Sequence, residues 1–332
     1  MKIALDAMGG DFAPVNPVAA AVQALKKLPA IERLILVGDE DILRAELAKH
    51  GEEPSERLHL FHTTQVIEMT DGAVEAVRRK KDSSLNRAID LLKEGAVDAA
   101  VSAGHTGALV ASSTIKLRNL KGVDRAGIAT LMPTRAGKFL LLDAGANVDA
   151  KPEHLLCYGI MGSVYCQNIL KIANPKVGLL CNGTEEVKGN ELTKEAFKLL
   201  KAAPINFIGN VEGHGLFEGA ADVVVCDGFI GNIVLKTAES LAKATFKWLK
   251  EEITSNPIRM AGAMLAQGAF KSIKAKTNAD EYGGALILGV NGICVKAHGS
   301  SSTLALYNSL RVASEAVETQ INPHIVDALS IK

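Results

Sequence analysis

The chain has 332 residues, of which 48% are hydrophobic and 22% charged, values typical of a globular protein large enough to bury a sizeable core. They exclude a small disulfide-stapled scaffold and an intrinsically disordered chain. The 37 basic and 37 acidic residues cancel, so no overall field favours nucleic acid, and electrostatic recognition must come from local patches.

Short apolar runs recur along the chain and end at polar or glycine residues, and helix-period stretches lie between them. This alternation predicts an α/β fold with a mainly parallel sheet covered by helices on both faces. The predicted strands are Ile3–Leu5, Leu34–Val37, Leu58–Phe61, Ala99–Val101, Leu140–Leu142, Val177–Cys181, Ile205–Ile208 and Val223–Cys226, and the predicted helices are Val18–Leu28, Ile42–His50, Leu85–Leu92, Leu192–Leu200 and Ile233–Leu249.

The C-terminal third departs from this alternation. Leu286–Val290, Asn291-Gly292 and Ile293–Val295 indicate a hairpin with a two-residue turn, which predicts an antiparallel edge of the sheet. No linker or internal repeat divides the chain. Residues 1–332 are therefore predicted to form one large α/β catalytic domain, with a protruding helical pair at about residues 235–280.

The segment after Asn256-Pro257 has an unusual apolar face. The proline ends the preceding helix, and Ile258–Lys276 carries apolar residues at helical spacing. Such a face suits an anionic lipid surface, and it suits a dimer or core contact equally well. The cations that flank this face are Arg259, Lys271, Lys274 and Lys276.

Several function classes find no support in the motifs. The five cysteines are scattered and form no C-x-x-C pair, which argues against a disulfide framework or a zinc ribbon and indicates a reducing cytoplasm. The glycines show neither the Rossmann nor the Walker order. The chain starts without the order of a signal peptide, and it has no run of 18 apolar residues. We therefore expect a cytoplasmic protein without a spanning helix.

Polar and glycine residues collect directly after the predicted strands, where open α/β sheets bind ligands. Each group has a structural alternative, such as a tight turn, a core histidine or a solvated charge. Taken together, the groups predict a phosphate-sized polar crevice, because several precede helices whose free N–H groups attract anions. The groups are Asp6, Gly9 and Gly10; Gly104, His105, Thr106 and Gly107; Asp143 and Asn147; Asn182, Thr184 and Lys188; Asp227 and Asn232; and Lys296, His298, Gly299, Ser300 and Ser301.

The same segments resemble a known family, the bacterial phosphate acyltransferases (PlsX) of phospholipid synthesis. The matching segments are Ile3–Asp11, Leu141–His154, Lys188–Lys194, Asp227–Asn232 and Lys296–Ser301, spread over almost the whole chain. His105 and Ser302 depart from the residues frequent in related sequences.

The resemblance implies transfer of a long-chain fatty acyl group from acyl carrier protein to inorganic phosphate, without cofactor or metal. The acyl phosphate then passes to a membrane glycerol-3-phosphate acyltransferase. The resemblance further implies a three-layer α/β/α sandwich like isocitrate and isopropylmalate dehydrogenases, a homodimer, no nucleic acid partner, and a cytoplasmic protein peripherally associated with the membrane through transient contact.

The reaction needs no enzyme nucleophile, because a thioester is already activated and phosphate is itself a nucleophile. Charge control and positioning should dominate. Lys188 and Lys296 are the predicted cations, and His298 is predicted to orient phosphate or relay a proton. The amides of 104–107 or 299–301 are the predicted anion cradle. Asp227 and Asn232 complete the predicted catalytic group, with Asp227, like Asp143, expected to orient lysine or asparagine side chains.

Three other functions stay open at this point: a scaffold without turnover, a nicotinamide-dependent dehydrogenase of the same fold class, and a phosphotransacetylase acting on coenzyme A thioesters. The last is also an acyltransferase, and residue types do not exclude it. A carrier protein donor would need a basic docking patch on this neutral chain. The densest candidate is Arg78-Arg79-Lys80-Lys81, which could equally be a solvated loop flank.

Overall fold

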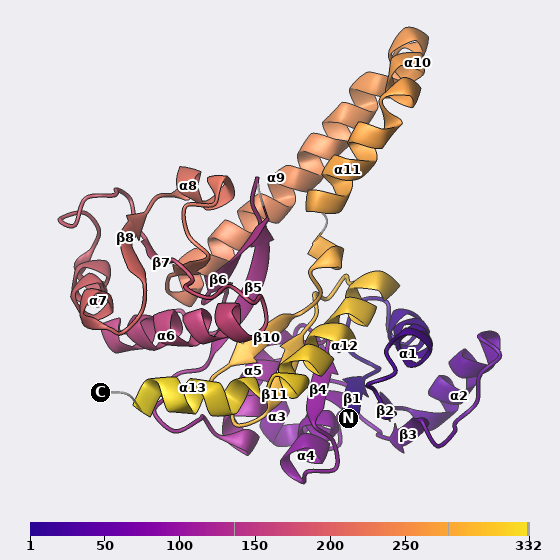
Figure 1. Ribbon diagram of the computed structural model, residues 1–332. Helices are drawn as coiled ribbons and strands as arrows, with labels where there is room; N and C mark the ends of the chain where they lie inside the picture. The colour runs from indigo at the N-terminus through magenta and orange to yellow at the C-terminus, as the bar shows by residue number, and fades with distance from the viewer. Residues whose placement is uncertain (136, 278, 331–332) are drawn as a thin grey trace.

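The computed structural model describes residues 1–135, 137–277 and 279–330, without the side chains of residues 274–277 and 279. The predicted cations Lys274 and Lys276 thus fall outside the described side chains. An 11-stranded sheet in the order β3-β2-β1-β4-β11-β10-β5-β6-β9-β7-β8 has helices on both faces (Figure 1). Its strands are β1 (Lys2–Asp6), β2 (Arg33–Gly38), β3 (Leu58–His62), β4 (Ala99–Ser102), β5 (Gly127–Pro133), β6 (Lys138–Leu142), β7 (Val177–Leu180), β8 (Phe207–Val211), β9 (Val223–Val225), β10 (Ala285–Leu288) and β11 (Ile293–Lys296).

The helices fill the intervals between strands, and the five helices predicted between the strands are all among the described ones. Their bounds are α1 (Val15–Lys27), α2 (Glu40–Lys49), α3 (Ala73–Arg79), α4 (Ser84–Lys93), α5 (Thr106–Leu117), α6 (Pro152–Asn168), α7 (Glu191–Ala202), α8 (Gly213–Glu218), α9 (Gly228–Thr254), α10 (Pro257–Leu265), α11 (Gln267–Thr277), the 3-10 turn η1 (Ala279–Glu281), α12 (Thr303–Glu318) and α13 (Ile321–Ser330).

The sheet consists of two parallel parts that run in opposite directions. Strands β3, β2, β1, β4 and β11 are parallel to one another, and so are β6, β9, β7 and β8. Antiparallel pairing of β10 with β11 and β5, and of β5 with β6, reverses the direction between them. The carboxyl ends of the two parts therefore point in opposite directions along the sheet.

The predicted β10–β11 hairpin is present, but two of its details are wrong. Residues 289–292, not a two-residue turn, connect the strands, because β10 already ends at Leu288. The hairpin also lies in the middle of the sheet, not at its edge. The reason is β5, which was not predicted and pairs with β10 through Leu286 and Ala129. The antiparallel strands thus join the two parts of the sheet.

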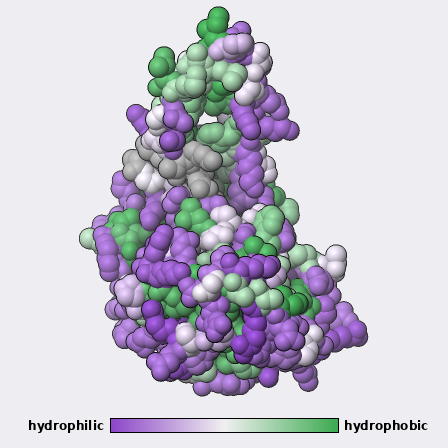
Figure 2. Space-filling model, turned by 90° about the vertical axis from the view of Figure 1, so that its right-hand side faces the viewer, coloured by the Kyte–Doolittle hydropathy of each residue, from purple (hydrophilic) through white to green (hydrophobic). Residues whose placement is uncertain are grey.

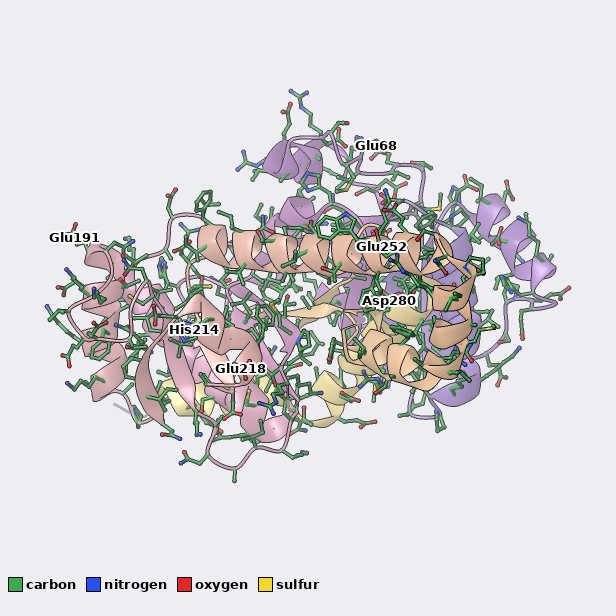
Figure 3. All side chains as sticks on the ribbon, turned by 90° about the horizontal axis from the view of Figure 1, so that it is seen from above. Glu68, Glu191, His214, Glu218, Glu252 and Asp280 are labelled. Carbon is green, nitrogen blue, oxygen red and sulfur yellow. The ribbon has the colours of Figure 1, made fainter. Side chains whose placement is uncertain are left out.

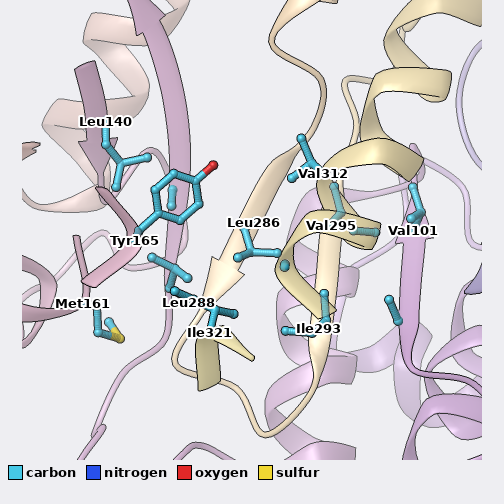
Figure 4. Packing of buried hydrophobic residues seen from close by; sticks show 14 of the residues in the cluster. Val101, Leu140, Met161, Tyr165, Leu286, Leu288, Ile293, Val295, Val312 and Ile321 are labelled. Atoms are coloured by element: carbon cyan, nitrogen blue, oxygen red, sulfur yellow. The ribbon is translucent and has the colours of Figure 1, made fainter. Parts of the chain in front are cut away.

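One continuous core underlies this junction. Figure 4 shows Leu286 and Leu288 of β10 packed near Val295 of β11, with Tyr165 of α6 on one side and Val312 of α12 on the other. All five are buried. Burying a leucine or valine side chain of this kind stabilises the fold by roughly 1.5–3 kcal/mol. Since the same cluster contacts strands of both directions, the two parts of the sheet fold as one unit.

Helices α9, α10 and α11 project from the body as a helical hairpin (Figure 1). Asn256 ends α9 and caps α10, since its Oδ1 accepts from the backbone N–H of Ile258 at 2.8 Å. The sequence predicts one helix over Ile258–Lys276, but the structure has two, α10 and α11, separated at Ala266. The second of them, α11, returns toward the sheet (Figure 1). No helix among the described residues is long and apolar enough to cross a membrane.

Apolar side chains are exposed at the outer end of this hairpin. Figure 2 shows them gathered at the tip of the molecule, above a body with a mostly polar surface. Ile258 is 82% exposed and Leu265 is 92% exposed. Arg259 closes the turn beneath them, with its Nη1 2.6 Å from Oε2 of Glu252. The tip is therefore an ordered apolar surface, and we call Ile258, Met260, Met264 and Leu265 the tip residues.

Candidate functional site

Three polar residues lie side by side at the carboxyl ends of β1, β4 and β11. Asp6 is in register with Ser102, and Ser102 with Lys296. All three are buried, Lys296 with 8% exposure. Ser102 Oγ donates to Asp6 Oδ2 at 2.6 Å, and Lys296 Nζ donates to the carbonyl of Ala103 at 3.3 Å and to that of Ala297. We call this the Lys296 row.

Burial shifts the pKa values of Lys296 and Asp6. It lowers the pKa of Lys296 to about 8, and the nearby Lys236 ammonium acts in the same direction, whereas Asp6 and Asp11 oppose the shift. Burial likewise raises the pKa of Asp6, opposed mainly by the hydroxyl of Ser102. Lys296 is thus a cation at neutral pH that can lose its proton slightly above it.

The glycines beside the row serve close packing. A Cβ on Gly9 would lie 2.5 Å from Asp6 Oδ2 and 2.7 Å from the nitrogen of Gly104, so only glycine fits there. Gly10 has φ +101°, and the next N–H, that of Asp11, donates to the carbonyl of Gly299 at 2.8 Å. These contacts bind the loops after β1, β4 and β11 into one unit around the Lys296 row.

His105 begins α5 as its N-cap. Its Nδ1 accepts from the backbone N–H of Ala108 at 3.1 Å, so a neutral His105 carries its proton on Nε2. Thr106 follows as the first helical residue, and a Cβ on Gly107 would lie 3.1 Å from Ala73 at the start of α3. His105 therefore replaces the usual short capping side chain, and its Nε2 side is available for other contacts.

His298 belongs to a turn directly after β11, in which the N–H of Ser301 donates to the His298 carbonyl at 3.0 Å. Its Nδ1 lies 2.9 Å from Ser300 Oγ and its Nε2 lies 2.7 Å from Nζ of Lys236. Glu239 Oε2 lies 3.2 Å from Lys236 Nζ. Partial burial and the Lys236 ammonium lower the pKa of His298, which favours a neutral ring.

Ser302, the second departure from the family pattern, is the N-cap of α12. Its Oγ accepts from the N–H of Ala305 at 3.2 Å and donates to Asp280 Oδ2 at 2.7 Å. Asp280, labelled in Figure 3, belongs to η1, which lies between α11 and β10 at the base of the hairpin in Figure 1. Ser302 thus ties α12 to the segment that returns from the hairpin.

Asp143, expected to orient lysine or asparagine side chains of the substrate site, and Asn147, another predicted residue of that site, organise the loop after β6. The Asp143 carboxylate accepts the backbone N–H groups of Ile128, Gly145, Ala146 and Asn147 at 2.8–3.0 Å. Asn147 Nδ2 donates to the hydroxyl of Tyr158 at 2.8 Å and to the carbonyl of Ala126. Asn147 Nδ2 also lies 3.3 Å from Asp143 Oδ2, so Asp143 contacts an asparagine as expected. These bonds give both side chains partners within the protein.

Asp227 and Asn232 lie at the start of α9. Asp227 is the N-cap, with Oδ1 accepting from the N–H of Ile230 at 2.8 Å. Asn232 is exposed and lies beside Gly145. A Cβ added to Gly145 would be 3.5 Å from the Cβ of Asn232. Asn232, Lys236 and Glu239 are spaced as one face of a helix. Asn232 therefore connects the loop after β6 with the Lys236 side of α9.

Asn182, Thr184 and Lys188 occupy the exposed loop after β7. The stem of Lys188 covers Gly183, where a Cβ would lie 2.6 Å from Lys188 Cγ. Among the described residues, no hydrogen bond or ion pair joins this loop to the Lys296 row. The structure thus brings together Asp6, Gly9, Gly10, Gly104, Lys296, His298, Gly299, Ser300 and Ser301, and it leaves Asn182, Thr184 and Lys188 in a separate loop.

Three residues near the row were not among the predicted site residues: Ser102, Lys236 and Glu239. Ser102 could have been found from strand length, because it is the last residue of β4 as Asp6 is of β1. Lys236 and Glu239 lie in the third turn of α9, away from any strand end. The sequence places Lys236 one helical turn beyond Asn232 without assigning it a role, and Glu239 follows at the next turn of the same face.

Known proteins are similar to this chain over almost its whole length. A family model described as "Fatty acid synthesis protein" matches residues 1–324. The chain is 52% identical over 320 residues to the phosphate acyltransferase of Desulfitobacterium hafniense (strain DSM 10664 / DCB-2), covering 96% of this chain and 95% of that protein. It is 48% identical over 336 residues to the phosphate acyltransferase of Akkermansia muciniphila, covering 99% and 96%.

Solved structures with low sequence identity share the fold. A phosphotransacetylase from Streptococcus pyogenes superposes with a TM-score of 0.64 at 18% identity, covering 96% of this chain and 94% of that one. The 4-hydroxythreonine-4-phosphate dehydrogenase from Klebsiella pneumoniae gives a TM-score of 0.51 at 15% identity, covering 98% and 99%. The predicted fold class, an α/β/α sandwich like that of isocitrate dehydrogenase, is confirmed.

Proposed function

The chain belongs to the fatty acid synthesis protein family and is a phosphate acyltransferase of fatty acid and phospholipid synthesis, and on this premise we propose that it moves a long-chain acyl group from acyl carrier protein to inorganic phosphate. The observation that carries the proposal is the Lys296 row with His298 and Ser300 at its mouth. A buried lysine beside a turn rich in donors suits an anionic nucleophile and a developing oxyanion.

The reaction proceeds by direct attack. A phosphate oxygen forms a bond to the thioester carbonyl carbon, and the negative charge moves to the carbonyl oxygen. Collapse of this intermediate breaks the C–S bond and releases the thiolate. Lys296, with a pKa of about 8, first stabilises the negative charge and can then supply the proton that the thiolate takes up.

The described cysteines support a route without a covalent enzyme intermediate. Burial raises the pKa of Cys157, Cys166 and Cys294 to about 12, and that of Cys226 rises well above its usual range. A thiolate is the reactive form, so these thiols are inert at neutral pH. Cys181 donates to Asn182 Oδ1 at 3.5 Å in the loop after β7. None of the five is bonded to the Lys296 row within the described chain.

A donor comparison tests the proposed substrate. Acyl carrier protein and coenzyme A carrying the same long-chain acyl group are offered with phosphate, and thiol release and acyl phosphate are both measured. We expect kcat/KM to be at least about tenfold higher for the carrier protein, because only it can add a protein contact surface. Equal or better use of the coenzyme A thioester would contradict the proposed donor and favour the phosphotransacetylase alternative.

Part of the predicted carrier patch is free to dock an acidic partner. Arg79 and Lys80 are paired internally, with Glu75 at 2.8 Å and Asp71 at 2.6 Å. The other two patch residues line an open pocket together with cations of α4 and α5. These lining residues are Arg78, Lys81, Arg87 and Lys116, with Asp90, Val77 and Ile115. We propose this pocket, and not the whole patch, as the docking point for acyl carrier protein.

Reversal of Arg78 and Lys81 to glutamate is expected to raise KM for acyl carrier protein by roughly fivefold and to flatten its salt dependence, since each exposed charge contributes below about 1 kcal/mol. Steady-state rates at several salt concentrations measure both effects. The same reversal at Lys198 and Lys201 on α7 makes a matched control. If KM and its salt dependence match the control, the docking proposal fails.

The projecting hairpin supports a location of the protein at the membrane surface. Acyl phosphate with a long chain dissolves poorly in water, and we propose that a membrane glycerol-3-phosphate acyltransferase consumes it. The tip residues provide an apolar surface for transient contact with an anionic bilayer, with Arg259 beside them. We further propose a cytoplasmic, peripherally membrane-associated homodimer.

A further inference from the structure

Lys236 brings a second ammonium group to the mouth of the Lys296 row. Its Nζ lies 2.7 Å from His298 Nε2 and 3.2 Å from Oε2 of Glu239. Lys236 is nine residues beyond the Asp227 N-cap, about 13 Å along the axis of α9. The start of α9 is bound to the other part of the sheet, because Gly228 N–H donates to the carbonyl of Asn147 at 2.8 Å. α9 thus crosses from one part of the sheet to the strand ends of the other.

The hydrogen-bond pattern leaves a donor of Lys236 free beside an exposed hydroxyl. His298 Nδ1 accepts the backbone N–H of Ser300 at 3.2 Å and lies 2.9 Å from Ser300 Oγ, while His298 Nε2 lies 2.7 Å from Lys236 Nζ. Ser300 is exposed, and its hydroxyl can contact a ligand as donor or acceptor. The Lys236 ammonium has three N–H groups and two neighbours, His298 and Glu239. One ammonium proton therefore remains for a ligand, next to the Ser300 hydroxyl.

The charges around this point also favour an anion. Lys236 and Lys296 approach the same histidine from α9 and β11, while Asp6 is buried and bonded to Ser102. Glu239 neutralises part of the charge of Lys236. The side chains of Lys236 and His298 are each 48% exposed, so a small solute can reach them from solvent.

We propose that Lys236, Ser300 and Lys296 bind inorganic phosphate, with Lys236 holding it in position for attack. This assignment rests on the proposed function and extends it to a residue of α9. A phosphate dianion would offset the repulsion between the two ammonium groups, which now contributes to the lowered pKa of Lys296. His298 is a positioning residue in this arrangement, because it orients Ser300 and Lys236.

The test is the Lys236→Met variant, assayed with acyl carrier protein thioester at varied phosphate. We expect KM for phosphate to rise at least about tenfold, because hydrogen bonds to charged groups contribute about 1.5–3 kcal/mol. KM for the acyl donor should change less than about twofold, because the donor contacts other residues. Lys236→Arg keeps the charge and should recover part of the phosphate affinity. Lys247→Met, also exposed on α9, is the matched control and should behave as wild type.

Phosphate binding to the enzyme without acyl donor, followed by calorimetry, provides a second readout independent of turnover. Weaker binding by Lys236→Met than by Lys247→Met supports the assignment. An unchanged phosphate affinity, or an equal rise in both KM values, would overturn it. If Lys236→Met fails to fold, Lys236→Gln is measured in the same two assays. Failure of the proposed function looks different: wild-type enzyme would form no acyl phosphate at any phosphate concentration.

Discussion

Lys296→Met is expected to lower kcat at least about tenfold, on the scale of removing one oxyanion donor. Methionine keeps most of the side-chain volume, and it removes an ammonium whose burial opposes folding. Because the pKa of Lys296 in the folded protein lies below its usual value, folding favours its neutral form, so the melting temperature should stay unchanged or rise. Steady-state kinetics and thermal unfolding measure the two effects.

The pH profile separates a catalytic role for Lys296 from a structural one. Wild-type kcat/KM, which reports pKa values of the free enzyme, should fall as the pH rises through about 8, because the ammonium form is lost, and Lys296→Met should lack that decline. Lys188→Met, predicted from the sequence to cause a similar loss, is measured beside it. If Lys188→Met and Lys296→Met lower kcat equally, the loop after β7 belongs to the active site. Wild-type kcat and an unchanged pH profile in Lys296→Met would exclude Lys296 from the chemistry.

Replacing Ile258 and Leu265 together by glutamate is expected to abolish sedimentation with anionic vesicles. Both side chains are largely exposed at the hairpin tip, so the change adds two negative charges and removes apolar area without opening a cavity. Turnover on carrier protein thioester in solution should be retained, since the Lys296 row lies near Lys236 in the first part of α9, whereas α10 follows the far end of that helix (Figure 1). Vesicle sedimentation and kinetics measure both.

Ile42→Glu on α2, where an isoleucine is 45% exposed, provides a control distant from the hairpin. It should sediment with vesicles as wild type does. Chromatography with light scattering reports the oligomeric state of all variants. Retained sedimentation by the Ile258 and Leu265 variant contradicts the membrane proposal. A change of oligomeric state in that variant alone would make the tip a contact between subunits.

Each of the eight predicted runs overlaps a strand, because a buried parallel strand must be apolar on both faces, but β8 spans Phe207–Val211 and not the predicted Ile205–Ile208. β5 was missed, since Gly127–Pro133 carries a terminal glycine and proline and resembles a loop. Helix α6 was also missed. It is buried on nearly all sides, so its sequence is apolar all round and shows no amphipathic stripe. Periodicity thus identifies elements with one buried face better than elements surrounded by protein.

The candidate site was only partly predictable, because a polar residue after a strand serves ligands or loops with the same local sequence. Lys296 ends the buried strand β11 and Asp143 directly follows the buried strand β6, yet the Asp143 carboxylate is saturated by backbone N–H groups of its own loop and of β5. Lys236 is recognisable in the sequence as a cation one helical turn beyond Asn232, but the sequence assigned it no role. Its position beside His298 depends on the angle at which α9 crosses the sheet, which is a property of tertiary packing.

The position of β11 beside β4 has a consequence for synthesis of the chain on the ribosome. Ala99 of β4 pairs with Ile293 of β11, which is synthesised almost two hundred residues later. The part of the sheet formed by β1 to β4 therefore stays incomplete until β11 has been made. Contacts of such sequence separation form slowly. Until β11 emerges, β4 has an open edge, and unpaired strand edges attract other chains. Nascent chains that stop before β10 should therefore depend on chaperones to stay unaggregated, and they lack Lys296 as well.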